Sequence, residues 1–188
     1  MKKIALLSFF IFNTIVYSQK PCEFSSNVKD SLGTYKSTSD YLMYENIFAG
    51  KSNYIFLVLE SNNGSTSLKI NFIRKSKEFI NATCFDKNSK LFFQLNNGKI
   101  ITLESFDKES CGNLIRDDKG YDNRVLSGSF LLKKEIFNDL KSSGINLMSL
   151  KYLNEIEDFI IRKAVISELD GKSYQPESFF MNQLHCIE

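Results

Sequence analysis

Short runs of alternating apolar and polar residues, separated by turn-forming residues, place the strongest constraint on the fold of this chain. Leu68, Ile70 and Phe72 alternate with polar residues, as in a strand with one buried face. The six consecutive apolar residues 54–59 predict a strand that is covered on both faces. Similar runs recur between Tyr41 and Ile166, so we expect a sheet of at least six strands.

The dipeptide Asn97-Gly98 gives the clearest local signal in the chain. Apolar residues dominate on both sides of it, over residues 91–95 and 100–103. Asn-Gly tolerates the two positive φ angles that a tight hairpin turn requires. The sequence therefore predicts a β-hairpin centred on these two residues.

Two short helices are expected late in the chain. The first covers residues 133–142, where apolar side chains recur at helical spacing before Gly144. The second begins near Pro176 and carries an apolar stripe that includes Phe180 and Leu184. We expect an α+β fold, a mostly antiparallel β-sheet with both helices packed on one face. Strands and helices do not alternate, which argues against a parallel doubly wound sheet.

The segment 1–18 has the features of a cleavable secretory signal peptide. Lys2 and Lys3 give a basic start, residues 4–15 are mainly apolar, and cleavage is expected near Ser18. We therefore expect an exported protein, periplasmic or secreted. No transmembrane segment is expected in the mature chain, because its apolar runs are shorter than the roughly 20 residues that span a bilayer.

Removal of the signal peptide leaves the segment 19–188, in which basic and acidic side chains balance. The whole chain has 24 Lys and Arg against 22 Asp and Glu, and the excess is lost with Lys2 and Lys3. The mature length is sufficient for one hydrophobic core, and we expect a single α+β domain over residues 41–188. Residues 19–40 are rich in Ser, Thr, Asn and Lys and are expected to form an irregular lead-in. The balanced charge gives no electrostatic basis for binding nucleic acid.

Four cysteines remain in the mature chain, at Cys22, Cys84, Cys111 and Cys186. An even number of cysteines in an exported protein predicts two disulfide bonds. All four are widely separated in the sequence, so the paired CxxC motifs of zinc or redox sites are missing. Three pairings are possible, and we expect Cys84 with Cys111, leaving Cys22 with Cys186 to tie the two termini.

The sequence offers few residues for catalysis or metal binding. Its one histidine, His185, is expected to face solvent, and on a helix its neighbour Cys186 would be turned about 100° away. A nucleophile and base pair is therefore not expected between them, and one histidine does not supply the usual set of nitrogen ligands for a metal. We expect no cofactor and lean against an enzyme.

The longest polar segment, residues 107–124, is expected to form a surface loop. Its charged residues make it the natural contact surface for a partner: Arg116, Asp117, Asp118, Asp122 and Arg124. The acids do not follow the spacing of an EF-hand, so a solvated loop with internal ion pairs is preferred to a calcium site.

Aromatic residues are abundant, with 17 Phe and 8 Tyr but no Trp. Most of them alternate with polar residues on expected strands, which favours a packed core over an apolar ligand cavity. Trp is the most common flat platform for sugars, and four tyrosines could replace it: Tyr41, Tyr44, Tyr121 and Tyr152.

Three stretches together resemble a group of uncharacterised exported proteins of flavobacteria-like bacteria. They are Cys84 to Ile100, Ile115 to Gly120 and Leu184 to Glu188, and the resemblance covers most of the mature chain. It implies residence in the periplasm or on the outer surface. It brings no assigned activity and no catalytic residues.

Three functions are consistent with these observations. The favoured one is a non-enzymatic exported domain that binds a protein, an envelope component or a small apolar ligand. The second is a hydrolase that uses carboxylates, such as Glu157 or Asp117 with Asp118. The third is an inhibitor or immunity-type partner of another secreted protein, which would use the segment 107–124 for contact.

Overall fold

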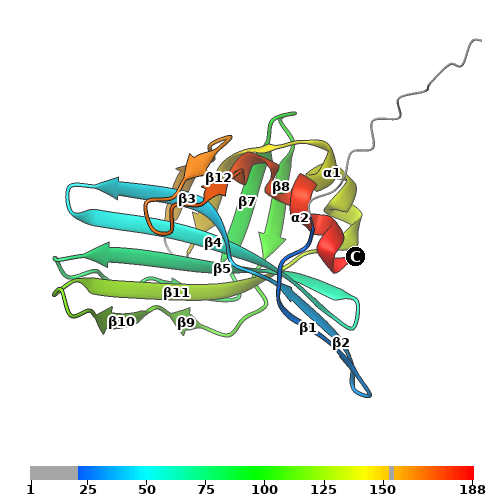
Figure 1. Cartoon of the computed structure of the whole chain (residues 1–188), viewed down its shortest axis with the longest axis horizontal. Helices are drawn as coiled ribbons and strands as arrows, with labels where there is room; N and C mark the ends of the chain where they lie inside the picture. The colour runs from blue at the N-terminus through cyan, green and yellow to red at the C-terminus, as the bar shows by residue number, and fades with distance from the viewer. Residues whose placement is uncertain (1–20, 153–154) are drawn as a thin grey trace, which may run out of the picture.

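The computed structural model describes residues 21–152 and 155–188, and its two main antiparallel β-sheets lie face to face. The strands of the two sheets cross steeply, and the helices gather at one end (Figure 1). The expected α+β class with mostly antiparallel strands is confirmed. The signal peptide expected over residues 1–18 lies outside the described residues.

The larger sheet has seven strands in the order β1-β2-β4-β5-β11-β10, and β3 pairs with the same edge of β4 as β2 does. Its strands are β1 (Phe24–Asp30), β2 (Gly33–Thr38), β3 (Tyr41–Phe48), β4 (Lys51–Asn62), β5 (Ser65–Ser76), β10 (Asn113–Arg116) and β11 (Asp122–Leu131). β4 and β5 are the longest, at 12 residues each, and they form the middle of the sheet.

The smaller sheet has four strands in the order β13-β12-β7-β8. These are β7 (Lys90–Leu95), β8 (Ile100–Glu104), β12 (Ile145–Lys151) and β13 (Ile156–Ile160). Two small pairs of strands complete the fold: β6 (Cys84–Phe85) with β9 (Ser110–Cys111), and β14 (Val165–Ile166) with β15 (Ser173–Tyr174).

The helices are short, and a 3₁₀ turn precedes each of them. The first group is η1 (Lys134–Ile136) and α1 (Phe137–Ser142), as expected for residues 133–142; the second is η2 (Pro176–Ser178), α2 (Phe179–Gln183) and η3 (Leu184–Ile187). α1 and α2 contact each other. In the described ranges, no helix combines the length and apolar character needed to cross a membrane.

The main core lies between the two sheets and reaches the helices. Ile55, Leu57 and Leu59 of β4 point into it and are fully buried, while the alternate residues Tyr54 and Phe56 face the other side of the sheet. That second side is partly covered by the β14–β15 hairpin, which packs Val165 into a small cluster with Leu42 and Tyr54. The strand of residues 54–59 is thus covered on both faces, as its continuous apolar run predicts.

The predicted hairpin at Asn97-Gly98 is confirmed, but its turn differs in detail. Gly98 has a φ of 85°, whereas Asn97 does not have a positive φ. The Leu95 carbonyl accepts a hydrogen bond from Gly98 N–H, and Leu95 N–H donates to the Lys99 carbonyl. This is the three-residue turn in which Gly takes the left-handed position. Two-residue turns with two positive φ angles occur instead between β3 and β4, at Ala49 (49°) and Gly50 (76°), and between β4 and β5, at Asn63 (50°) and Gly64 (81°).

The expectation of an irregular lead-in over residues 19–40 is wrong, because β1 and β2 form a regular hairpin there. Most of its side chains are exposed, and Leu32 at its tip is 88% exposed. The hairpin extends beyond the rest of the sheet (Figure 1). A strand pair without a buried face needs no alternation of apolar residues, so the sequence carried no signal for it.

A further expectation, a single loop over the polar segment 107–124, is also wrong. Residues 107–124 are not one loop, since β10 pairs with β11 and β11 begins at Asp122. The acidic stretch 155–158 lies largely on β13, which begins at Ile156. In both places charged residues lie on strands at or next to a sheet edge, where alternate side chains reach solvent.

Candidate ligand-binding site

A hollow of about 400 Å³ opens where four distant segments of the chain meet. They are the stretch before β1, the connection from β2 to β3, β15 and α2. The residues around the hollow are Pro21, Glu23, Thr38, Ser39, Asp40, Tyr41, Lys172, Ser173, Tyr174, Phe179, Asn182 and Gln183. Its size is within the range of small-molecule sites, which is about 300–1,000 Å³.

Three aromatic rings form the apolar part of the hollow. The Tyr41 ring makes an edge contact with Tyr174, with 5.3 Å between centroids, and a tilted contact with Phe179 at 5.1 Å. Phe179 is fully buried, whereas Tyr41 and Tyr174 are half-buried. Such contacts hold each ring in a defined orientation.

Backbone features fix the position of Tyr41. A bulge in β3 between Leu42 and Tyr44 shifts the register against β4 just after Tyr41. The Tyr41 hydroxyl accepts a 2.8 Å hydrogen bond from Gln175 N–H, which links β3 to the segment after β15. Burial raises the pKa of Tyr41 above its usual value, so the hydroxyl stays protonated at neutral pH.

Polar groups surround the aromatic rings. Asp40 is exposed, and its Oδ1 accepts a 2.9 Å hydrogen bond from Asn71 Nδ2. The Tyr174 hydroxyl donates to Asp170 Oδ2 at 2.6 Å, and burial followed by this bond raises the pKa of Tyr174. The other polar side chains beside the hollow include Glu23, Lys172, Asn182 and Gln183. The site therefore offers both hydrogen-bond donors and acceptors around an aromatic floor.

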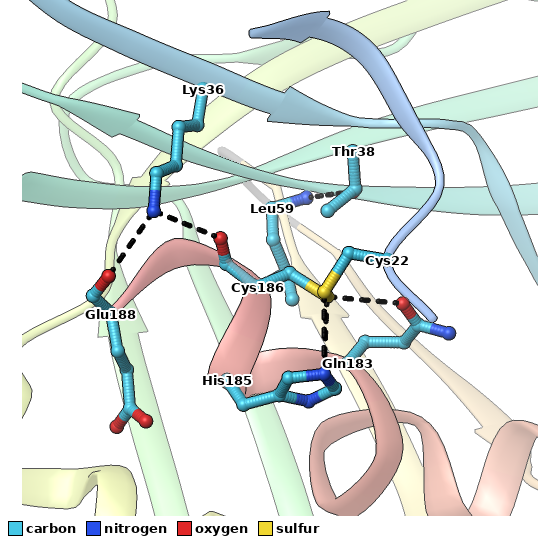
Figure 2. Close-up of a disulfide and its surroundings, with 8 residues drawn as sticks. All are labelled: Cys22, Lys36, Thr38, Leu59, Gln183, His185, Cys186 and Glu188. Carbon is cyan, nitrogen blue, oxygen red and sulfur yellow. Dashed lines mark hydrogen bonds between the residues drawn. A yellow bond between two sulfur atoms is a disulfide. The ribbon is translucent and has the colours of Figure 1, made fainter. Parts of the chain in front are cut away.

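The disulfide Cys22–Cys186 (Figure 2) joins two segments of the chain that contribute residues to the hollow. Cys22 lies between the lining residues Pro21 and Glu23, and Cys186 follows the lining residue Gln183 by three positions. The second disulfide, Cys84–Cys111, joins β6 to β9. Both bonds have the pairing expected from the sequence.

His185 does not face solvent as expected but lies half-buried against the disulfide. Its Nε2 is 3.2 Å from Cys22 Sγ and 3.7 Å from Cys186 Sγ. The expected direction assumed an α-helix with 3.6 residues per turn. The chain from Leu184 to Ile187 is a tighter 3₁₀ turn, which changes the direction of each side chain.

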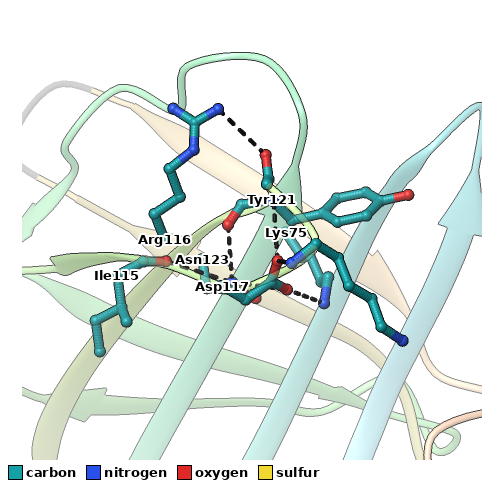
Figure 3. Close-up of polar contacts among 8 residues, drawn as sticks. Lys75, Ile115, Arg116, Asp117, Tyr121 and Asn123 are labelled. Carbon is teal, nitrogen blue, oxygen red and sulfur yellow. Dashed lines mark hydrogen bonds and ion pairs between the residues drawn. The ribbon is translucent and has the colours of Figure 1, made fainter.

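Asp117, one of the proposed contact residues, instead organises the turn between β10 and β11 (Figure 3). Its Oδ2 binds Lys75 Nζ at 2.6 Å, and its Oδ1 accepts hydrogen bonds from Lys119 N–H at 3.0 Å and Tyr121 N–H at 2.9 Å. The Lys75 contact and the Tyr121 N–H hold the pKa of Asp117 far below its usual value. Both carboxylate oxygens are thus occupied within the protein.

The remaining contact candidates separate into buried and exposed pairs. Asp122 and Arg124 lie on β11 and are only 9% and 8% exposed, so they are poorly placed to reach a partner. Arg124 donates hydrogen bonds to the carbonyls of Ile80 and Gly112. Arg116 and Asp118 are exposed, as a contact surface requires.

Two of the carboxylates named for a hydrolase, Glu157 and Asp117, are not brought together. Glu157 on β13 binds Arg74, whereas Asp117 binds Lys75. Arg74 and Lys75 are consecutive on β5, so their side chains point to opposite faces of the sheet. Each acid is paired with a base on its own side, and the two do not share a cleft.

Two groups of described residues bring metal-ligating side chains together, Cys22 with His185 and Cys186, and Cys84 with Glu109 and Cys111. In each group both sulfur atoms are bonded to each other. A disulfide offers no thiolate, which is the form of cysteine that binds metals.

Sequence reasoning singled out Tyr41 as a platform but missed Tyr174 and Phe179, which lie near the other end of the chain. Only the folded chain brings them together.

No protein-family model matches this chain, and comparison with the curated proteins and with the solved structures found no match.

Proposed function

We propose that the protein binds a small hydroxyl-rich molecule, a saccharide unit of an envelope component or glycan, in the hollow beside Tyr41 and Tyr174. The observation that carries this proposal is the combination of aromatic rings with carboxylate and amide groups around one hollow of about 400 Å³. The proposal makes the favoured interpretation of the sequence, a non-enzymatic binding domain, more specific by naming the class of ligand.

The chemistry of a sugar ring fits both parts of the hollow. One side of the ring carries C–H groups, which pack on an aromatic face. Its hydroxyl groups donate to carboxylates such as Asp40 and Glu23 and exchange both kinds of hydrogen bond with amides such as Asn182. A purely apolar ligand is a poorer match, because binding it would desolvate these charged groups without replacing their hydrogen bonds.

Binding of simple sugars by the oxidised protein tests the proposal. Glucose, galactose, N-acetylglucosamine and their short oligomers serve as probes in ligand-observed NMR, followed by calorimetric titration of those that bind. Choline is included, because two carboxylates beside tyrosines would also suit an organic cation. Binding of choline with no binding of any sugar would contradict the saccharide assignment.

Variants of Tyr174 connect binding to the hollow. Tyr174→Ala removes an aromatic contact, and we expect the affinity for sugar to fall about tenfold, equivalent to roughly 1.4 kcal/mol. Tyr174→Phe keeps the ring and should bind within about twofold of the unchanged protein. Tyr121→Ala removes a ring at the β10–β11 turn instead and is the matched control. Unchanged binding in Tyr174→Ala, with the fold verified by circular dichroism, would exclude this hollow as the site.

A further inference from the structure

We propose that Cys22–Cys186 is a reducible clasp on the ligand hollow, opened by a dithiol reductant with His185 as the proton donor. Opening the clasp releases one wall of the hollow and lowers its affinity for ligand. The part of this inference that concerns affinity rests on the function proposed above, whereas the part that concerns reduction does not.

The position of His185 is the first observation. Its Nε2 lies 3.2 Å from Cys22 Sγ and 3.7 Å from Cys186 Sγ, so one imidazole nitrogen reaches both sulfur atoms. Figure 2 shows the ring directly beside the disulfide, with Lys36 on the other side of Cys186. An adjacent imidazolium stabilises a thiolate and makes it a better leaving group.

The unequal exposure of the two cysteines sets the direction of attack. Cys22 is partly exposed, whereas Cys186 is only 3% exposed. A thiolate of the reductant attacks Cys22 Sγ and forms a mixed disulfide, and the electron pair of the broken S–S bond leaves on Cys186 Sγ. His185 gives its Nε2 proton to that sulfur. The second thiol of the reductant then releases Cys22 as a thiolate, which takes a proton from solvent, so two thiols form and the dithiol becomes a disulfide.

Besides His185, the charged groups nearest the clasp are engaged with main-chain oxygens, paired with each other or exposed to solvent. Lys36 from β2 places Nζ 3.5 Å from the Cys186 carbonyl oxygen and 3.3 Å from the main-chain oxygen of Glu188. Lys141 from α1 binds the Glu188 side chain and so offsets its charge. Glu23, next to Cys22 in the chain, is exposed to solvent.

The second disulfide has the opposite environment and provides an internal control. Glu109 Oε1 is 3.9 Å from Cys111 Sγ, and a carboxylate at this distance disfavours a thiolate. The imidazole of His185 thus lies beside Cys22–Cys186, whereas the carboxylate of Glu109 lies beside Cys84–Cys111. Their opening rates can be compared in one sample, which cancels the effect of pH on the reductant itself.

Opening the clasp affects the hollow through the chain on either side of the bond. Pro21 and Glu23 flank Cys22, while Asn182 and Gln183 precede Cys186, and all four line the hollow. With the bond broken, the stretch before β1 loses its covalent connection to η3. One wall of the hollow is then free to move away from Tyr41.

Reduction kinetics test the exchange step. The folded protein is treated with dithiothreitol at pH 6 and pH 8, quenched with acid and alkylated, and the opening of each disulfide is followed by peptide mass spectrometry. We expect the opening rate of Cys22–Cys186, relative to Cys84–Cys111, to depend on His185 at both pH values, because its Nε2 lies 3.2 Å from Cys22 Sγ and 3.7 Å from Cys186 Sγ. His185→Gln should lower this ratio about tenfold at pH 6, the effect of removing a nearby positive charge.

Glu109→Gln is the matched control, because it changes the charge beside the other disulfide and should leave the opening rate of Cys22–Cys186 unchanged. A relative rate that is equal in the original protein and in His185→Gln at both pH values would overturn the role of His185. A misfolded variant would not be mistaken for a change in the opening rate, because circular dichroism confirms that each variant is folded before the reductant is added.

Ligand titration of the singly reduced protein tests the effect on the hollow. After selective opening and alkylation of Cys22 and Cys186, we expect at least a tenfold loss of affinity for the sugar that binds the oxidised form. Equal affinity in both forms would refute the clasp. If the oxidised protein binds no sugar, the proposed function fails. The role of His185 in reduction is still tested in that case, because the reduction kinetics do not depend on a ligand.

Discussion

Replacement of Arg124 by alanine should destabilise the protein much more than replacement of Arg116, although the sequence presents both as charged residues of one polar segment. Arg124 is 8% exposed, and its guanidinium donates to the Gly112 carbonyl at 2.7 Å and to the Ile80 carbonyl at 2.9 and 3.2 Å. These bonds tie β11 to the segments next to Cys84 and Cys111. The Arg116 side chain is 70% exposed.

The expected loss follows from the two carbonyls that remain without their donor. A hydrogen bond from a charged donor contributes about 1.5–3 kcal/mol, so Arg124→Ala should lower the free energy of unfolding by about 3 kcal/mol or more. For a chain of this size, that is a fall in melting temperature of roughly 6–12 °C. Arg116→Ala should change the free energy of unfolding by less than about 0.5 kcal/mol.

Urea unfolding followed by far-ultraviolet circular dichroism measures both variants, with both disulfides kept intact. A loss below about 1 kcal/mol in Arg124→Ala, or equal losses in the two variants, would refute the reasoning. Arg124→Lys adds a further comparison, because lysine keeps the charge but cannot reach both carbonyls with the geometry of a guanidinium. It should lie between the original protein and the alanine variant.

Two other predictions concern stability. Gly128→Ala places a Cβ 2.6 Å from Phe85 Cδ2 in the core, and we expect the free energy of unfolding in urea to fall by about 1–3 kcal/mol. A second change, Phe85→Leu, should recover part of this loss. If the losses of the two single variants simply add in the double variant, the clash is contradicted. Asp117 has a lowered pKa in the fold, so its contribution is present above about pH 4 and fades as pH falls. The stability difference between the original protein and Asp117→Asn should therefore shrink between pH 6 and pH 2, with the exposed Asp118→Asn as control; a difference that is constant with pH would count against the ion pair.

The sequence predicted those parts of the fold in which burial leaves a periodic pattern. Leu68, Ile70 and Phe72 all point into the core, as their alternation indicates. The β1–β2 hairpin was missed because its pairing depends on backbone hydrogen bonds and local polar contacts. Asp30 Oδ1, for example, accepts hydrogen bonds from Leu32 N–H and Gly33 N–H at the turn.

The candidate site was less accessible to sequence reasoning than the fold. Tyr41 was recognisable as a potential platform from its residue type alone. Its partners Tyr174 and Phe179 come from the other end of the chain, and no local pattern links residues so far apart. The same limit applies to Arg124, whose burial depends on the position of Ile80 and Gly112 rather than on its own neighbours in the sequence.

The Cys22–Cys186 bond also determines how the protein responds to mechanical force. It encloses nearly all of the described chain in one covalent ring, with a sequence separation of 164 residues. A pull applied outside the two cysteines passes through the sulfur–sulfur bond, so the strands between them carry no load and cannot be drawn apart. Once the bond is reduced, the same pull acts on the edge hairpin of β1 and β2, and the fold becomes extensible from that end.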